Sequence, residues 1–121
     1  MIDHVGFEVA DLARSAAFYD PVFFALGVRR FLTADRAIAY GDNAPGFWIV
    51  ARGREPRPDY GHIALRATGR AAVDAAYAAG IANGGADEGP PGPRPQYGPR
   101  YYAAYMRDPD GLRVEVATGS R

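Results

Sequence analysis

The 121-residue chain contains no cysteine and no lysine, so its 14 basic residues are all arginine. Their absence excludes disulfide bonds, thiolate nucleophiles and lysine Schiff bases. Serine occurs only as Ser15, in a helical stretch, and as Ser120, beside the C-terminus. Neither serine follows a strand at a sharp turn into a helix, which argues against serine-hydrolase chemistry. Catalysis is therefore left to histidine, carboxylate, tyrosine, arginine and any bound metal.

The chain also lacks an excess of charge and a long apolar run. Its 14 acidic residues balance its 14 arginines, so the overall charge does not favour nucleic acid or an anionic membrane as a partner. No apolar run approaches the roughly 20 residues of a membrane span, and the N-terminus begins with a strand pattern instead of a signal peptide. These features predict a cytoplasmic protein whose partner is a small neutral molecule.

The first half of the sequence predicts a strand, a helix and three more strands. Residues 2–9 alternate with a period of two, which directs His4 away from the apolar face. Asp11 is a good N-cap for a helix that should end at Gly27, and Pro21 should kink or divide that helix. Three short strands are then expected near 28–33, 36–41 and 46–52.

The second half repeats this pattern after a polar, proline-broken linker. A strand from Tyr60 directs His62 away from its apolar face, and a helix is expected over 71–80, with Gly80 as its stop. The glycine- and proline-rich stretch 84–99 predicts a long loop around one short strand. The chain should end in a hairpin with strands at 101–107 and 112–117 and a turn at 108–111.

A duplication within 121 residues predicts two halves of one domain, because neither half is large enough for a core of its own. The single domain should cover 1–121, with module 1 at about 1–52, the linker at about 53–59 and module 2 at about 60–118. The only two histidines of the chain occupy matching places at the start of each module.

His4, His62 and Glu115 together suggest a metal site. Imidazole and carboxylate are the ligands expected for a divalent transition metal, and three such ligands leave three octahedral positions open for a substrate. The alternative is that each of these side chains is merely solvated or hydrogen-bonded. Aligning the last strands of the two modules places Ile49 where Glu115 stands, so the first module lacks a matching carboxylate.

Three segments resemble the vicinal oxygen chelate superfamily, which includes glyoxalase I, extradiol dioxygenases, fosfomycin-resistance transferases and bleomycin-resistance proteins. They are Asp3-His4-Val5 with 11–19, Gly61-His62-Ile63-Ala64, and 107–115. The resemblance implies an α+β fold in which two βαβββ modules in one domain form a half-open barrel, or cup, of mixed and antiparallel strands with flanking helices. It also implies a homodimer and a divalent metal ion (iron, manganese, zinc or nickel) bound by His4, His62 and Glu115.

The resemblance further implies a metal-dependent enzyme that acts on a small, vicinally oxygenated substrate as a lyase, isomerase, transferase or ring-cleaving dioxygenase. A metal-free protein of the bleomycin-resistance type, which binds or sequesters a small molecule, is the alternative. A conventional glyoxalase I reaction is not expected, because Ile49 stands at the position of the usual fourth ligand. The chain also lacks the further histidine of extradiol dioxygenases and the lysine of fosfomycin transferases.

Residues near Glu115 supply further candidates. Tyr101 is interpreted as a cup-facing proton donor or substrate contact, with Glu115 as a second catalytic residue. Candidates for substrate binding are Phe47, Ile49, Tyr97 and Arg100. Phe47 and Ile49 are expected to form an apolar wall for the substrate, and ordinary core packing is the alternative for both.

Overall fold

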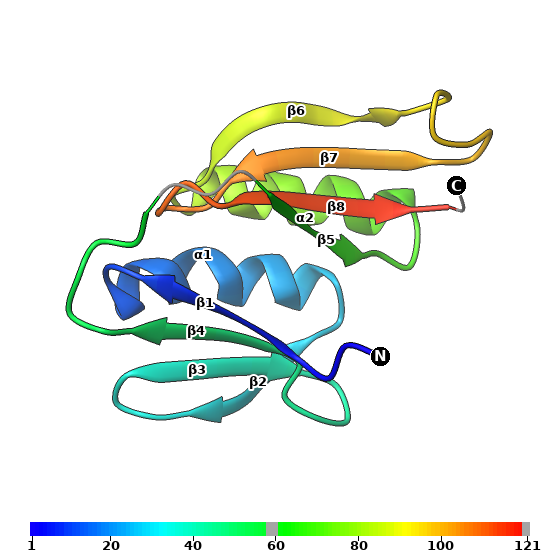
Figure 1. Cartoon of the computed structure of the whole chain (residues 1–121). Helices are drawn as coiled ribbons and strands as arrows, with labels where there is room; N and C mark the ends of the chain where they lie inside the picture. Colours follow the sequence, from blue (N-terminus) through cyan, green and yellow to red (C-terminus); the bar gives the residue numbers. More distant parts are fainter. Residues whose placement is uncertain (58–60, 120–121) are drawn as a thin grey trace.

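The computed structural model describes residues 1–57 and 61–119 and contains two βαβββ modules (Figure 1). Module 1 consists of β1 (Val5–Val9), α1 (Leu12–Ala25), β2 (Arg29–Thr33), β3 (Ala37–Gly41) and β4 (Phe47–Ala51). Module 2 consists of β5 (His62–Arg66), α2 (Arg70–Ala82), β6 (Ala86–Pro93), β7 (Tyr102–Arg107) and β8 (Arg113–Thr118). The predicted order of elements is confirmed, whereas the predicted strand start at Tyr60 and the end of the linker lie outside the described residues.

Each module forms a four-stranded mixed sheet, in the order β1-β4-β3-β2 or β5-β8-β7-β6. The first strand of each module runs parallel to the last, and the remaining neighbours are antiparallel. β1 and β5 therefore lie at sheet edges, and no hydrogen-bonded strand pair joins the two sheets in the described part of the chain. The α+β class is confirmed, and the described residues of one chain form no closed barrel.

Helix α1 begins as its sequence predicts. The Asp11 side chain caps α1 by accepting a 2.9 Å hydrogen bond from the backbone N–H of Arg14, which satisfies one of the free donors at the helix start. Gly27 follows the end of α1 with φ of 79°, a conformation that favours glycine. No helix within 1–57 and 61–119 is long and apolar enough to cross a membrane.

Two predicted helix breakers do not break their helices. α1 continues through Pro21 without being divided, so of the two effects predicted there, a kink or a division, the division does not occur. α2 likewise runs through Gly80 to Ala82. Gly80 is instead a packing residue, because an added Cβ would lie 2.5 Å from Sδ of Met106 and 3.1 Å from a ring carbon of Phe18. The missing side chain lets α2 approach β7 and α1 closely.

One hydrophobic core joins the two modules. The helices pack against each other, and each covers one face of its own sheet (Figure 1). The core includes the fully buried Phe18, Val22 and Val73, and burial of such a side chain contributes on the order of 1.5–3 kcal/mol. Because strand residues alternate between faces, His62 and Glu115 belong to the face of the second sheet that is directed away from the helices, and His4 immediately precedes β1 of the first sheet.

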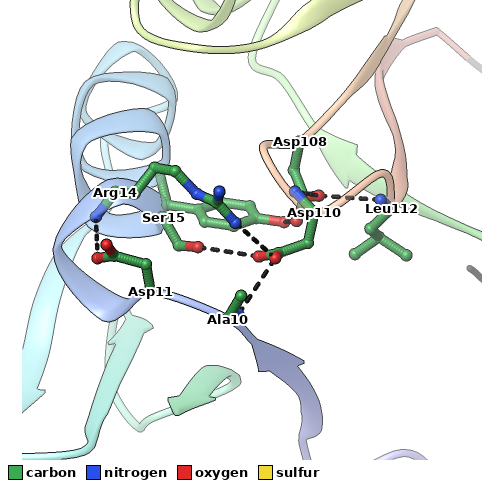
Figure 2. A network of polar contacts seen from close by, with 8 residues as sticks. Ala10, Asp11, Arg14, Ser15, Asp108, Asp110 and Leu112 are labelled. Carbon is green, nitrogen blue, oxygen red and sulfur yellow. Dashed lines mark hydrogen bonds and ion pairs between the residues drawn. The ribbon is translucent and has the colours of Figure 1, made fainter. Parts of the chain in front are cut away.

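The turn between β7 and β8 fastens module 2 to the start of α1 (Figure 2). One carboxylate oxygen of Asp110 accepts hydrogen bonds from the backbone N–H of Ala10, at 3.1 Å, and from Arg14, at 2.8 Å, and the other accepts one from the Ser15 hydroxyl at 3.2 Å. Asp108, in the same turn, accepts a 2.7 Å hydrogen bond from the buried Tyr19 hydroxyl. The predicted turn is confirmed, with Gly111 at φ of 94°, and its carboxylates orient the modules.

Candidate functional site

His62, Tyr101 and Glu115 meet on the outer face of the second sheet. Nε2 of His62 lies 3.1 Å from Oε2 of Glu115, and the Tyr101 hydroxyl donates a 2.5 Å hydrogen bond to Oε1 of the same carboxylate. The three residues come from β5, from the segment just before β7 and from β8. Parallel pairing of β5 with β8 sets Ala64 beside Glu115, and this small neighbour leaves room for the imidazole two residues earlier.

The Glu115 carboxylate is buried, and one of its oxygens has no well-aligned hydrogen bond. Its side chain is 1% exposed, and Oε2 faces Nε2 of His62 at 3.1 Å, an ion-pair contact that lacks the alignment of a hydrogen bond. A buried polar atom without a hydrogen bond costs about 1–3 kcal/mol, so such atoms are rare in native structures and call for a physical reason. An ion or ligand that accepts this lone pair would supply one.

A pocket of about 140 Å³ opens beside this carboxylate. Its lining consists of His62, Arg94, Gln96, Tyr97, Tyr105, Arg113 and Glu115. The guanidinium of Arg113 lies 4.5 Å from the centre of the Tyr105 ring, and that of Arg94 lies 5.6 Å from it. Burial and the nearby negative charge of Glu115 raise the pKa of Tyr105, so its hydroxyl stays protonated near neutral pH.

His4 lies apart from this cluster. Its imidazole Nδ1 is 2.7 Å from Oδ1 of Asp3, and its side chain is 56% exposed. Within the described ranges, no three side chains of the metal-binding types come together. A single chain therefore unites His62 with Glu115 but does not bring the third predicted ligand to them.

Comparison with known proteins decides the family. Residues 1–116 match the family model described as Glyoxalase/Bleomycin resistance protein/Dioxygenase superfamily. The chain belongs to this superfamily. No curated protein is similar enough to count as a match.

Similar solved structures cover nearly all of the chain. A glyoxalase/bleomycin resistance protein from Albidiferax ferrireducens T118 is 35% identical, with 94% of each chain covered and a TM-score of 0.82. The fosfomycin resistance protein FosX from Mesorhizobium loti is 23% identical, with 99% of this chain and 92% of that one covered and a TM-score of 0.73. A lactoylglutathione lyase from Agrobacterium tumefaciens is 23% identical over 98% and 93%, with a TM-score of 0.67. The last two likenesses establish the shared fold alone.

The strand register corrects the alignment of the two modules in this superfamily member. Trp48 pairs with Gly6, just as Glu115 pairs with Ala64. His4 and His62 stand two residues before Gly6 and Ala64, so the counterpart of Glu115 is Trp48. The expected match with Ile49 was wrong by one residue. An apolar side chain nevertheless occupies the position, so the first module still lacks a carboxylate there.

The expected apolar wall of Phe47 and Ile49 belongs to the core. Their exposed fractions are 5% and 0%, and both lie in the hydrophobic cluster with Tyr19 and Phe23 of α1. One-residue alternation directs them toward the helices, on the face opposite to that of Trp48. Core packing, the alternative interpretation of these two residues, agrees with this placement, and neither residue belongs to the pocket.

Of the remaining predicted site residues, Tyr97 lines the pocket, Tyr101 contacts Glu115 without lining the pocket, and Arg100 lies at the surface. Tyr101 shares the face of Glu115 as expected. The Tyr97 ring packs edge-on against the Tyr101 ring, with 5.6 Å between the ring centres. Arg100 is exposed and does not line the pocket. Arg113 lines the pocket instead, although it was not among the residues predicted from the sequence. The signal was present, because Arg113 is two residues from Glu115 on one strand and must share its face.

Proposed function

We propose that this protein is a divalent-metal enzyme acting on a small oxygenated molecule, with His62 and Glu115 of one chain and His4 of a second copy as the metal ligands. The buried Glu115 carboxylate, whose Oε2 has no well-aligned hydrogen bond and lies 3.1 Å from Nε2 of His62, is the observation that carries the proposal. Membership of the superfamily supports it. The donor types support it as well, because carboxylate and imidazole suit zinc, manganese, iron and nickel.

The donor atoms fit a divalent ion. Two ligands at right angles around a metal, each about 2.1 Å away, are separated by about 3.0 Å, close to the observed spacing of Nε2 and Oε2. At His4, the Asp3 carboxylate engages Nδ1 and leaves Nε2 to act as the ligand. A carboxylate behind a ligand histidine fixes its ring and tautomer and strengthens binding.

A second copy of the chain is the natural source of the third ligand. His4 immediately precedes β1 of the first sheet and Glu115 lies in β8 of the second, and the two helices pack between these sheets. β1 and β5 are both edge strands of five residues; His4 immediately precedes β1, and His62 is the first residue of β5. Edge strands offer free backbone groups for pairing, so we expect a homodimer in which module 1 of one copy faces module 2 of the other.

The bound ion would hold vicinal substrate oxygens and stabilise the negative charge that develops on them. Tyr101 fixes the Glu115 carboxylate through Oε1 and thereby aims Oε2 at the ligand position. When this hydrogen bond is released, the same hydroxyl can donate its proton to a substrate oxygen. Tyr101 and Glu115 remain the catalytic residues of the proposal, and Tyr97 lines the substrate side. The identity of the reaction within lyase, isomerase, transferase or dioxygenase chemistry stays open.

Metal analysis of protein purified without chelator tests the proposal. We expect a divalent ion in the wild type and its loss in His62→Ala, Glu115→Gln and His4→Ala. Glu88→Gln is the matched control, because Glu88 is a half-exposed carboxylate that pairs with Arg107 outside the pocket. No ion in the wild type, or undiminished metal in His62→Ala, would contradict the proposal.

Mixing two variants tests whether the site spans two chains. A dimer of one His4→Ala chain and one Glu115→Gln chain contains one site with all three ligands and one with a single histidine. Co-refolding the two variants should therefore restore metal binding that neither variant shows alone. If all three ligands came from one chain, the mixture would bind no more metal than either variant alone. Size-exclusion chromatography at micromolar concentration should show the dimer.

A metal-free binding protein is the second candidate. The aromatic and arginine lining of the pocket beside Glu115 favours it, and so does the lack of a three-ligand group in the described part of one chain. Small-molecule binding that quenches Trp48 fluorescence and persists after metal removal would support this function. Binding that strictly requires metal would count against it.

A further inference from the structure

We propose that the pocket beside Glu115 recognises an anionic group of the ligand, a carboxylate or a phosphonate, through Arg94 and Arg113. The proposal rests on the proposed function, because it places the anionic group of the substrate next to the His62 and Glu115 donor atoms. The pocket of about 140 Å³ has room for such a group and a few further atoms, so the ligand class is a small oxyacid.

Both arginines are held in the pocket without a carboxylate partner. Arg94 and Arg113 are partly buried against the Tyr105 ring, and neither forms an ion pair with another described residue. Arg94 also donates a 2.8 Å hydrogen bond to the Pro90 carbonyl. By contrast, Arg107, on the neighbouring strand, is neutralised by Glu88.

The charges of the lining leave a positive balance. Arg94 and Arg113 contribute two positive charges, and Glu115 contributes one negative charge. The Glu115 charge is already stabilised by the hydrogen bond from Tyr101, and bound metal would reduce its repulsion of an anion further. Two guanidinium groups near one aromatic ring repel each other, so an anion between them relieves that repulsion.

The donor chemistry favours an oxyanion over a neutral ligand. A guanidinium presents N–H donors in a planar fork that matches a carboxylate or phosphonate in bidentate geometry. Stacking on Tyr105 restricts the rotation of both side chains, which reduces the entropy lost when they bind. Gln96, on the pocket wall, adds an amide donor. A neutral carbonyl or hydroxyl would use few of these donors and none of the charge.

Binding is measured with the full-length protein from which metal has been removed and the chelator dialysed away. Heteronuclear NMR titration follows the arginine side-chain signals while methylphosphonate or acetate is added in a buffer free of other oxyanions. The neutral counterparts, dimethyl methylphosphonate and acetamide, are added in parallel. We expect both anions to bind more tightly than their neutral counterparts, and the two anion arms distinguish a phosphonate site from a carboxylate site.

Substitutions then assign the binding. Arg94→Gln and Arg113→Gln should each weaken anion binding by about tenfold, because each removes a charge-assisted hydrogen-bonding group. Arg113→Lys keeps the charge but loses the fork, so it should restore part of that loss. Arg100→Gln is the matched control, since Arg100 is exposed and lies outside the pocket. Thermal unfolding of each variant verifies that it is folded.

Three results would overturn this assignment: equal binding of the anions and neutral compounds, unchanged binding in both glutamine variants, or an equal loss in Arg100→Gln. Metal content, measured on separate samples, distinguishes this failure from failure of the proposed function. Metal binding without arginine-dependent anion binding rejects the anion pocket alone. Arginine-dependent anion binding in a chain that takes up no metal rejects the metal enzyme and retains an oxyacid-binding protein.

Discussion

The Tyr101 hydroxyl donates a 2.5 Å hydrogen bond to Oε1 of the buried Glu115 carboxylate, while Oε2 accepts none. One oxygen is thus anchored to the protein and the other is presented to a ligand. This division ties stability to function at one side chain. Removing the anchor should harm both, whereas removing the carboxylate should abolish the site and relieve the cost of an unsatisfied buried oxygen.

Tyr101→Phe tests the anchor. The variant deletes the hydroxyl that donates a hydrogen bond to the buried Oε1, so we expect a loss of about 1–3 kcal/mol in the free energy of unfolding by urea. Tyr77→Phe is the control, because the Tyr77 hydroxyl bonds to Asp87 at the surface and water can replace it. Equal stability of Tyr101→Phe and wild type would contradict the anchoring role.

Asp110→Ala tests the junction between the modules. Three hydrogen bonds to α1 and the residue before its cap are lost, and the N–H of Ala10 is left partly buried without its partner. We expect a loss of about 1–3 kcal/mol in unfolding free energy. Asp35→Ala, at an exposed turn, is the matched control and should change stability by less than about 0.5 kcal/mol. A similar result for both variants would show that the Asp110 contacts do not hold the modules together.

Asp108 should contribute to the stability of the protein at acidic pH, and this contribution should be lost as the pH rises. Burial raises the pKa of Asp108 above its ordinary value of 3.8, although the Tyr19 hydroxyl and backbone N–H groups act in the opposite direction. A carboxyl with a raised folded-state pKa favours folding fully below its unfolded pKa, and that contribution is lost as pH rises through the folded value. Relative to Asp108→Asn, which does not titrate, the wild type should lose stability as pH rises from about 3.8 toward neutrality. Urea unfolding of both proteins across this range measures the difference, and a constant difference would contradict the prediction.

Local patterns were sufficient to predict most of the fold. Strand alternation and the Asp11 cap depend on neighbouring residues, and both are confirmed. Gly80 misled because its role depends on Met106 and Phe18, which lie far away in sequence. The register of β4 was missed for a similar reason. Consecutive apolar residues in that strand give no alternation, so only pairing with β1 decides which of them faces the core.

Several residues of the candidate site were predictable from the sequence, but the way all of its residues come together was not. His62, Tyr101 and Glu115 do meet, because their faces follow from alternation along β5 and β8 and just before β7. The balanced charge of the whole chain suggested a neutral partner, yet charge balance says nothing about where two arginines gather. Arg94 and Arg113 come together only through the pairing of three strands and a loop.

Exchanging one residue at a time in β4 tests the corrected register. Ile49 is fully buried, so Ile49→Glu would place a carboxylate in the apolar core and should destabilise the protein by more than about 4 kcal/mol or prevent folding. Trp48 is only partly buried on the opposite face, so Trp48→Glu should cost about 1–2 kcal/mol in urea unfolding at the same protein concentration. Trp48→Gln controls for loss of the indole.

If the metal site exists, Trp48→Glu should retain metal at least as well as the wild type, because its carboxylate stands where Glu115 stands in module 2. A stable Ile49→Glu together with an unfolded Trp48→Glu would return the alignment to Ile49.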